Sequence, residues 1–157
     1  MEFSAFYRDT IRLLTGFLIH QGASGHVAAD IAQQTMEDSW RCWSGIKHPK
    51  AWVYKAASRA LVRKVASLEE LVEEVPEPTA LLPRPDAFAE WEAQHDMLPL
   101  LRTLPPRQRQ VLAWALSGFT PADIADQLGL PAETIRASLR KARRAAAAYL
   151  AAREEER

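Results

Sequence analysis

The sequence predicts an all-α fold of two small helical domains joined by an acidic, proline-rich linker. Apolar residues recur at helical spacing near both ends of the chain, and four prolines fall between positions 76 and 85. Because prolines interrupt helices and stiffen linkers, this cluster marks a domain boundary. We therefore expect a first domain at 1–65, the linker at 66–85 and a second domain at 86–152.

Charge is distributed unevenly along a chain whose formal net charge is zero. The 157 residues include 20 Lys and Arg and 20 Asp and Glu. Nine acidic residues and one basic residue fall in 65–98, whereas basic residues outnumber acidic ones in 1–64 and in 131–157. Two basic regions flank an acidic middle, and this asymmetry allows an anionic partner such as DNA despite the neutral total.

Composition and motifs exclude several classes of protein. No apolar run is long enough to span a membrane and no signal peptide opens the chain, so we expect a cytoplasmic protein. Cys42 is the single cysteine, which excludes an internal disulfide framework and a cysteine-based zinc site. There is no Gly-rich phosphate loop, metal-ligand cluster or nucleophile–base pair, so we expect neither an enzyme nor a cofactor.

The first domain is expected to begin with two amphipathic helices, at 3–21 and 26–43, separated by Gly22 and Gly25. The inward residues of the first helix are Phe6, Leu13, Leu14, Phe17 and Leu18. The inner stripe of the second helix is Ala28, Ala32, Met36, Trp40 and Trp43. Another face of the second helix, either solvated or a polar docking surface, aligns Asp30, Gln33, Gln34, Glu37 and Arg41.

Pro49 opens a third helix after a short loop that begins at Gly45. Its core-facing residues are Trp52, Val53, Ala56, Ala57, Ala60 and Leu61. Basic residues of the loop and of another helix face fit either a solvated surface or a stripe that follows phosphates: Lys47, His48, Lys50, Lys55, Arg59 and Arg63. Ser67 then predicts the N-cap of a separate, short acidic helix that ends at Val75.

The second domain opens with a helix capped by Asp86 and interrupted at Pro99, and a further helix starts at Pro106. Its most informative stretch is 120–146, which reads as a helix, a tight turn at Gly129 and a second helix. The first helix is predicted from an N-cap at Thr120, from Pro121 and from Asp123 in a capping box. The inward residues of the second helix, which starts at Pro131, are Ile135, Leu139 and Ala142.

The outward face of that second helix is basic. Its residues are Thr134, Arg136, Ser138, Arg140, Lys141, Arg143 and Arg144. A basic helix that follows a short apolar helix and a glycine turn is the helix-turn-helix pattern of DNA-binding proteins. The alternative is an ordinary antiparallel helix pair with a solvated, charged face.

Three segments together resemble extracytoplasmic-function (ECF) sigma factors. Residues 101–143 (LRTLPPRQRQVLAWALSGFTPADIADQLGLPAETIRASLRKAR) resemble region 4 of that family, VAADIAQQTMEDSW (27–40) resembles region 2, and HPKAWVYKAASRALVRK (48–64) resembles the segment that follows it. The resemblance covers 5–64 and 98–150, in the family's order. It implies a protein that is not an enzyme and that gives promoter recognition and DNA opening to RNA polymerase.

The resemblance also implies a role for each surface. Asp30, Gln33 and Gln34 would dock on the clamp helices of core RNA polymerase, whose flap is a further contact. The loop 44–50 and the basic helix after it would bind the −10 promoter element, melt it and hold a flipped base. The helix 131–146 would enter the major groove at the −35 element. Such sigma factors usually have an anti-sigma protein as a further partner.

Some positions depart from the family pattern. Arg59 and Arg63 stand where the family has Asn and Asp, and Ser138 stands where it has Arg. These departures leave two other functions open. One is a sigma-like adaptor that sequesters an anti-sigma protein. The other is a stand-alone helix-turn-helix regulator that binds symmetric operators without polymerase.

Overall fold

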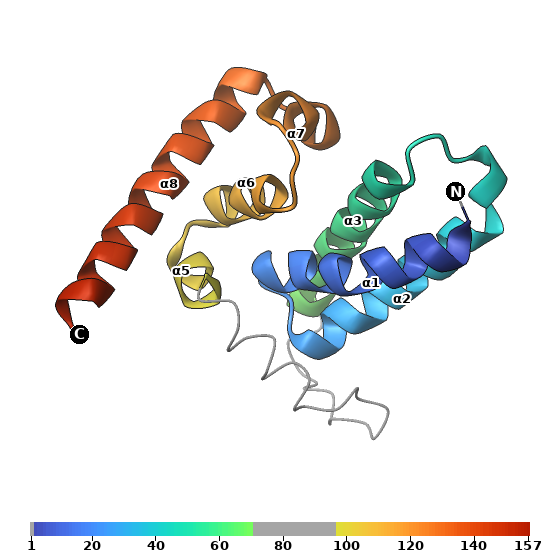
Figure 1. Cartoon of the computed structure of the whole chain (residues 1–157), viewed down its shortest axis with the longest axis horizontal. Helices are drawn as coiled ribbons and strands as arrows, with labels where there is room; N and C mark the ends of the chain where they lie inside the picture. Colours follow the sequence, from blue (N-terminus) through green and yellow to red (C-terminus); the bar gives the residue numbers. More distant parts are fainter. Residues whose placement is uncertain (1, 71–96) are drawn as a thin grey trace. The chain divides into compact units, whose positions relative to one another are not determined.

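The computed structural model describes residues 2–70 and 97–157, with side chains described at 2–67 and 97–157. Within these residues all regular secondary structure is helical, which confirms the predicted all-α class. The helices form two compact units, one built on the helices before residue 71 and the other on those after residue 96 (Figure 1). Most of the expected linker and the helix expected after Asp86 lie outside the described residues.

Up to residue 70, where the description of the first unit ends, three helices and a short 3-10 turn build it. They are α1 (Phe3–His20), α2 (Gly25–Arg41), η1 (Trp43–Gly45) and α3 (Pro49–Glu70). Ser24 is the N-cap of α2, and its Oγ accepts a hydrogen bond of 3.2 Å from the Val27 N–H, one of the backbone donors that the first turn leaves without a partner. The core confirms most of the predicted inward positions: Phe6, Leu14, Phe17, Leu18, Ala28, Ala32, Met36, Val53, Ala57 and Leu61.

Two predicted core residues of the first unit are instead exposed. Leu13 is 64% exposed and Trp40 is 61% exposed, so both predictions were wrong. Leu13 lies at the edge of the apolar stripe of α1, about 100° around the helix from Leu14. On α2 each four-residue step drifts about 40° around the axis, and three such steps carry position 40 away from the core that Ala28 faces. The buried residue in the last turn of α2 is Ser39, whose hydroxyl donates to the Met36 carbonyl at 2.7 Å.

α3 is longer than the sequence predicted. It continues through Ser67 to Glu70, so Ser67 does not cap a separate helix. The physical reason is that no glycine or proline lies between Pro49 and Pro76, and nothing in this segment breaks a helix. The pattern also missed Tyr54, which is fully buried with its ring centroid 4.7 Å from that of Phe17.

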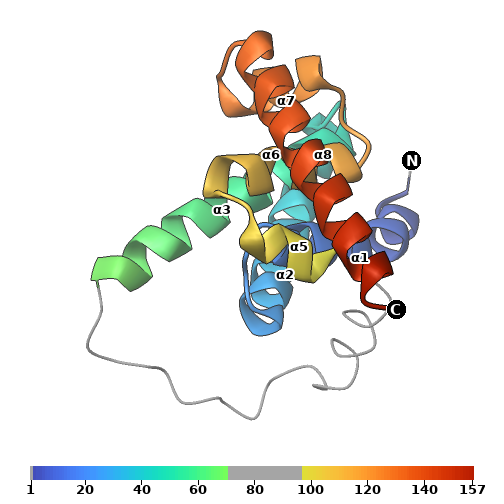
Figure 2. The same cartoon turned by 90° about the vertical axis from the view of Figure 1, so that its left-hand side faces the viewer.

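From residue 97 on, the second unit is described as four helices: α5 (Leu98–Thr103), α6 (Pro106–Leu116), α7 (Pro121–Leu128) and α8 (Ala132–Glu155). α8 packs on both α6 and α7, and it is the long helix that runs past them in both views (Figures 1 and 2). Pro99 and Pro106 both stand in the first turn of their helices, where a missing N–H is tolerated. α8 is the longest of these helices and continues to Glu155.

Arg109 joins α5 to α6 in the second unit. Its Nε donates to the Leu101 carbonyl at 3.0 Å, and its Nη2 donates to the Leu104 carbonyl at 3.1 Å. These carbonyls stand in the last turn of α5 and just after it, and the Leu101 carbonyl also accepts from the Leu104 N–H at 3.2 Å. Arg109 therefore fixes the turn that leads into the helix-turn-helix, a role that its sequence position did not reveal.

No helix in the described part of the chain combines the length and the apolar character needed to cross a bilayer.

Candidate nucleic-acid interface

The turn between α7 and α8 is built by local hydrogen bonds, as the sequence predicted. Thr120 Oγ1 accepts from the Asp123 N–H at 3.2 Å, and Asp123 Oδ2 accepts from the Thr120 N–H at 3.1 Å, which completes a capping box. The hydrogen bond from the Thr120 backbone N–H, and to a lesser degree the Thr120 side chain, stabilises the carboxylate and lowers the pKa of Asp123 below its ordinary value of 3.8. Gly129 ends α7 with φ at 65°, a left-handed conformation that glycine adopts at little cost.

α8 divides into a buried and an exposed side. Ile135, Leu139 and Ala142 are buried, which confirms the predicted inward positions. The predicted outward residues lie away from the core, all of them exposed except the half-buried Ser138: Thr134, Arg136, Ser138, Arg140, Lys141, Arg143 and Arg144. Arg136 pairs with Glu133 at 2.6 Å, an exposed i,i+3 ion pair. The face as a whole is a dense array of cations on a rigidly supported helix.

The loop after α2 and the following α3 carry the second basic surface. Of its predicted residues, Lys47, His48, Lys50, Arg59 and Arg63 are exposed and Lys55 is half-buried. The Lys50 ammonium lies 5.8 Å from the ring centroid of Tyr54, within the range of a cation–π contact. Between residues 39 and 68 the chain carries seven Lys and Arg and no Asp or Glu. This segment is therefore strongly positive, although the whole chain is neutral.

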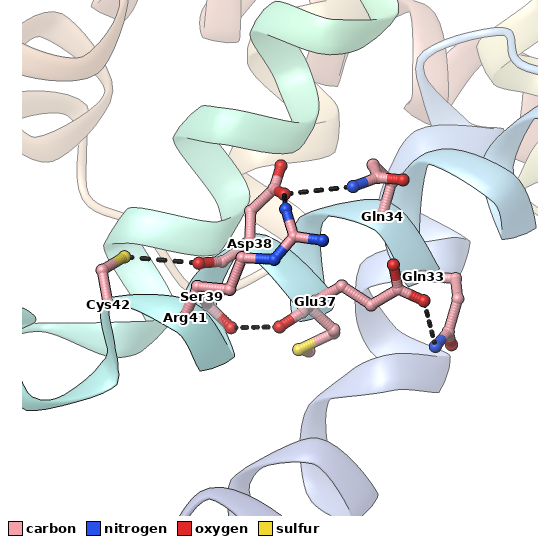
Figure 3. Close-up of polar contacts among 8 residues, drawn as sticks. Gln33, Gln34, Glu37, Asp38, Ser39, Arg41 and Cys42 are labelled. Atoms are coloured by element: carbon pink, nitrogen blue, oxygen red, sulfur yellow. Dashed lines mark hydrogen bonds and ion pairs between the residues drawn. The ribbon is translucent and has the colours of Figure 1, made fainter.

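The predicted polar face of α2 is exposed along its length, at Asp30, Gln33, Gln34, Glu37 and Arg41. Side-chain contacts order Gln33, Gln34, Glu37 and Arg41 (Figure 3). Gln33 accepts from the Tyr7 hydroxyl at 2.7 Å and donates to Glu37 at 3.5 Å. At the N-terminal end His26 lies 3.6 Å from Asp30.

Asp38 is the member of this network that the sequence analysis missed. It accepts a hydrogen bond of 3.0 Å from Gln34 and pairs with Arg41 at 3.5 Å (Figure 3). The sequence could have revealed this role, because Asp38 lies four residues after Gln34 and three before Arg41, and residues at these spacings are neighbours on a helix surface. The face therefore contains three acidic groups and one cation, and most of its polar groups are already oriented by a neighbour.

Among the described residues, no group of three histidine, cysteine, aspartate or glutamate side chains is placed to hold a metal ion.

The fold and these surfaces define a class: an all-helical protein of two units, one of which carries a helix-turn-helix with a basic second helix. Residues 95–145 match the family model of sigma-70, region 4. The chain is also similar to the sigma factor RpoE, solved in a co-crystal with the anti-sigma factor NepR from Bartonella quintana. The TM-score is 0.68 at 19% identity, over 91% of this chain and 92% of that one.

A second similar structure is that of CnrH in complex with the cytosolic domain of CnrY. Here the TM-score is 0.63 at 19% identity, over 96% of this chain and 88% of that one. No match was found among curated protein sequences. Residues 95–145 thus match sigma-70 region 4, and the chain shares the all-helical fold of these two solved structures.

Proposed function

We propose that this protein is an ECF-type sigma factor, which binds core RNA polymerase and directs promoter recognition and DNA opening. The observation that carries the proposal is the sigma-70 region 4 helix-turn-helix on a chain whose remaining helices follow the same sigma fold. In this proposal 1–65 is the region 2-like domain, 66–85 the linker and 86–152 the region 4-like domain. The protein performs no chemistry itself, and it acts in the cytoplasm, where the polymerase and its promoters are found.

We assign the −35 element to α8. Two long cations on its exposed side, Arg136 and Arg140, suit base edges in the major groove, and Thr134 is short enough to approach a base directly. Lys141, Arg143 and Arg144 suit phosphates, and half-buried Ser138 stands where the family carries a further cation. Phosphate contacts fix the position of the helix, whereas the base contacts select the sequence.

We assign the −10 element to the positive segment that follows α2. Lys47, His48 and Lys50 stand at the loop and at the start of α3, and Lys55, Arg59 and Arg63 continue along that helix. Each cation that neutralises a phosphate releases a condensed counterion, so binding here will depend strongly on salt. Arginine at positions 59 and 63 adds charge where the family has shorter polar groups.

We assign polymerase docking to the polar face of α2. Its excess of carboxylates repels DNA, and its oriented amides offer specific hydrogen bonds to a protein partner. An anti-sigma protein is a further proposed partner, because the solved structures of both similar proteins contain an anti-sigma factor or the cytosolic domain of a partner protein. Such an antagonist would cover the surfaces that polymerase needs.

Run-off transcription tests the function directly. Purified core polymerase is incubated with a library of promoter DNA, with and without this protein. We expect promoter-specific transcripts only when the protein is present, and their start sites reveal both promoter elements. Binding to core polymerase without transcripts would favour the sigma-like adaptor. Symmetric operator binding without any affinity for core would favour the stand-alone regulator and contradict the proposal.

A further inference from the structure

The C-terminal half of α8 extends beyond the core of the second unit. The last fully buried residue of this helix is Ala142, and every later one is exposed or half-buried. In both views this part of α8 leads away from α7 (Figures 1 and 2). Helical spacing places eight of its exposed residues on one side, within about 160° around the axis. This C-terminal face consists of Arg143, Arg144, Ala147, Ala148, Leu150, Ala151, Glu154 and Glu155.

The C-terminal face is apolar in the middle and oppositely charged at its two ends. Two arginines begin it, two glutamates end it, and between them lie alanines and Leu150, which is 44% exposed. Among the described residues, no ion pair or side-chain hydrogen bond satisfies any of the four charges: Arg143, Arg144, Glu154 and Glu155. The glutamates also stand in the last turn of α8, where the helix dipole disfavours negative charge. The stability of α8 itself therefore does not account for its acidic end.

This pattern is complementary to itself when a second copy runs antiparallel. With a two-fold axis at Tyr149, residues equally far before and after this position lie opposite one another. Arg144 then faces Glu154 of the second copy, and symmetry repeats this pair at the other end. The remaining positions also match: Arg143 with Glu155, Ala147 with Ala151, and Ala148 with Leu150. Every charge of the face thus meets an opposite charge, and every apolar residue meets an apolar one.

We propose that the C-terminal face of α8 is a self-association surface, through which two copies of this chain form an antiparallel, two-fold symmetric dimer. The alanines let the two helix axes approach closely, and Leu150 contributes apolar area. The contact is short, because residues 143–155 span about 18 Å of helix. It therefore belongs with the small, transient interfaces, and we expect the dimer to form at micromolar rather than nanomolar concentration.

The dimer has a consequence for DNA binding. It covers Arg143 and Arg144, which the proposed function assigns to phosphates. A guanidinium that is engaged with a glutamate of the second copy is not available to a phosphate. Self-association of the free protein therefore competes with binding to the −35 element, and this consequence alone rests on the proposed function. The dimer itself is measured without DNA or polymerase, so its failure is distinct from a failure of the proposed function.

Sedimentation velocity of the full chain, from micromolar to near-millimolar concentration, measures self-association. We expect the wild type to shift from monomer toward dimer as its concentration rises. Arg144→Glu sets like charges opposite one another at both ends of the contact, and it should raise the dissociation constant roughly tenfold or more. Glu154→Arg should do the same. Arg12→Glu is the matched control, because it makes the same change of charge at an exposed position of α1.

Mixing the two variants separates charge pairing from any loss of folding. Arg144→Glu and Glu154→Arg carry opposite charges at the positions that face one another between the two chains. An equimolar mixture should therefore form heterodimers with a dissociation constant close to that of the wild type. Circular dichroism of each variant confirms that it remains folded.

Four results would overturn the inference. They are a wild type that stays monomeric over the whole range, a dimer that Arg144→Glu leaves intact, equal weakening by Arg12→Glu, and a mixture that associates no better than its components. A monomeric wild type combined with loss of affinity for core polymerase in Arg144→Glu would assign the C-terminal face to the polymerase instead of a second copy.

Discussion

The exposed faces of α8 and α2 differ in how far their charges are satisfied within the protein. On α8, Arg136 is ion-paired, whereas Arg140 and Lys141 form no ion pair among the described residues. On α2, Asp38 binds both Gln34 and Arg41. An array of unpaired cations attracts any dense negative charge, and a set of oriented, mutually bonded groups requires a partner that matches them. The difference supports the proposed assignment of α8 to DNA and of the polar face of α2 to a protein partner.

The largest expected effect comes from removing the support beneath the basic face of α8. Leu139 is buried, and Leu139→Ala should lower the free energy of unfolding of the second unit by about 2–5 kcal/mol. Denaturant unfolding followed by circular dichroism measures the change. Leu150→Ala removes the same atoms from a position of α8 that is 44% exposed, and it should have a much smaller effect. Equal losses in the two variants would contradict the packing described for α8.

The second prediction concerns the cations themselves. Arg140→Ala should weaken binding to a −35 duplex by about 1–3 kcal/mol if the side chain contacts a base, with little change in affinity for core polymerase. A gel shift across salt concentrations and base substitutions measures affinity and specificity together. Arg153→Ala is the control, because Arg153 lies in the last turn of the same helix and is half-buried. An unchanged affinity in Arg140→Ala would remove this residue from the proposed contacts.

The third prediction concerns α2, where we expect the opposite of Arg140→Ala: weaker binding to core polymerase and unchanged binding to DNA. Asp38→Ala leaves Gln34 and Arg41 without their shared partner, and it should weaken binding to core polymerase by roughly tenfold. Binding to the −35 duplex should stay the same. Asp9→Ala removes an exposed carboxylate from α1 and serves as the control. If Asp38→Ala instead altered DNA affinity alone, the division of labour between α2 and α8 would be wrong.

The smallest effect is the pH dependence of the capping box. The pKa of Asp123 is lowered in the folded protein, so its carboxylate stabilises the fold above the ordinary pKa of aspartate. This contribution is lost as the pH falls through the lowered value. The difference in unfolding free energy between wild type and Asp123→Asn should therefore be largest near neutrality and shrink below about pH 3.8. Asp126→Asn, on the same helix, is the matched control because it leaves the capping box of Thr120 and Asp123 intact.

The helix-turn-helix was predictable in detail because its determinants are local. Thr120, Asp123 and Gly129 each act within a few residues, and the three inward positions of α8 follow helical spacing. The exposed sides of α8, α2 and the loop at 47–50 were predictable for the same reason. Their binding partners come from the family resemblance and remain proposals.

Other features depend on neighbours that periodicity does not specify. Trp40 continues an apolar stripe, but its exposure depends on where the core ends. Arg109 and Asp38 gain their roles from groups that their side chains happen to reach. The end of α3 was misjudged because a good N-cap residue, Ser67, is tolerated inside a helix when nothing stops the helix.

The unbroken course of α3 has a consequence for how the chain can change in length. From Val65 to Glu70 the backbone rises about 1.5 Å and turns about 100° with every residue. A deletion of one residue there barely shortens the helix, yet it points the following chain in a different direction. Insertions and deletions in this segment therefore rotate the point where the chain leaves α3 around the axis of that helix. Those whose length is close to a whole number of helical turns change the direction of the departing chain least.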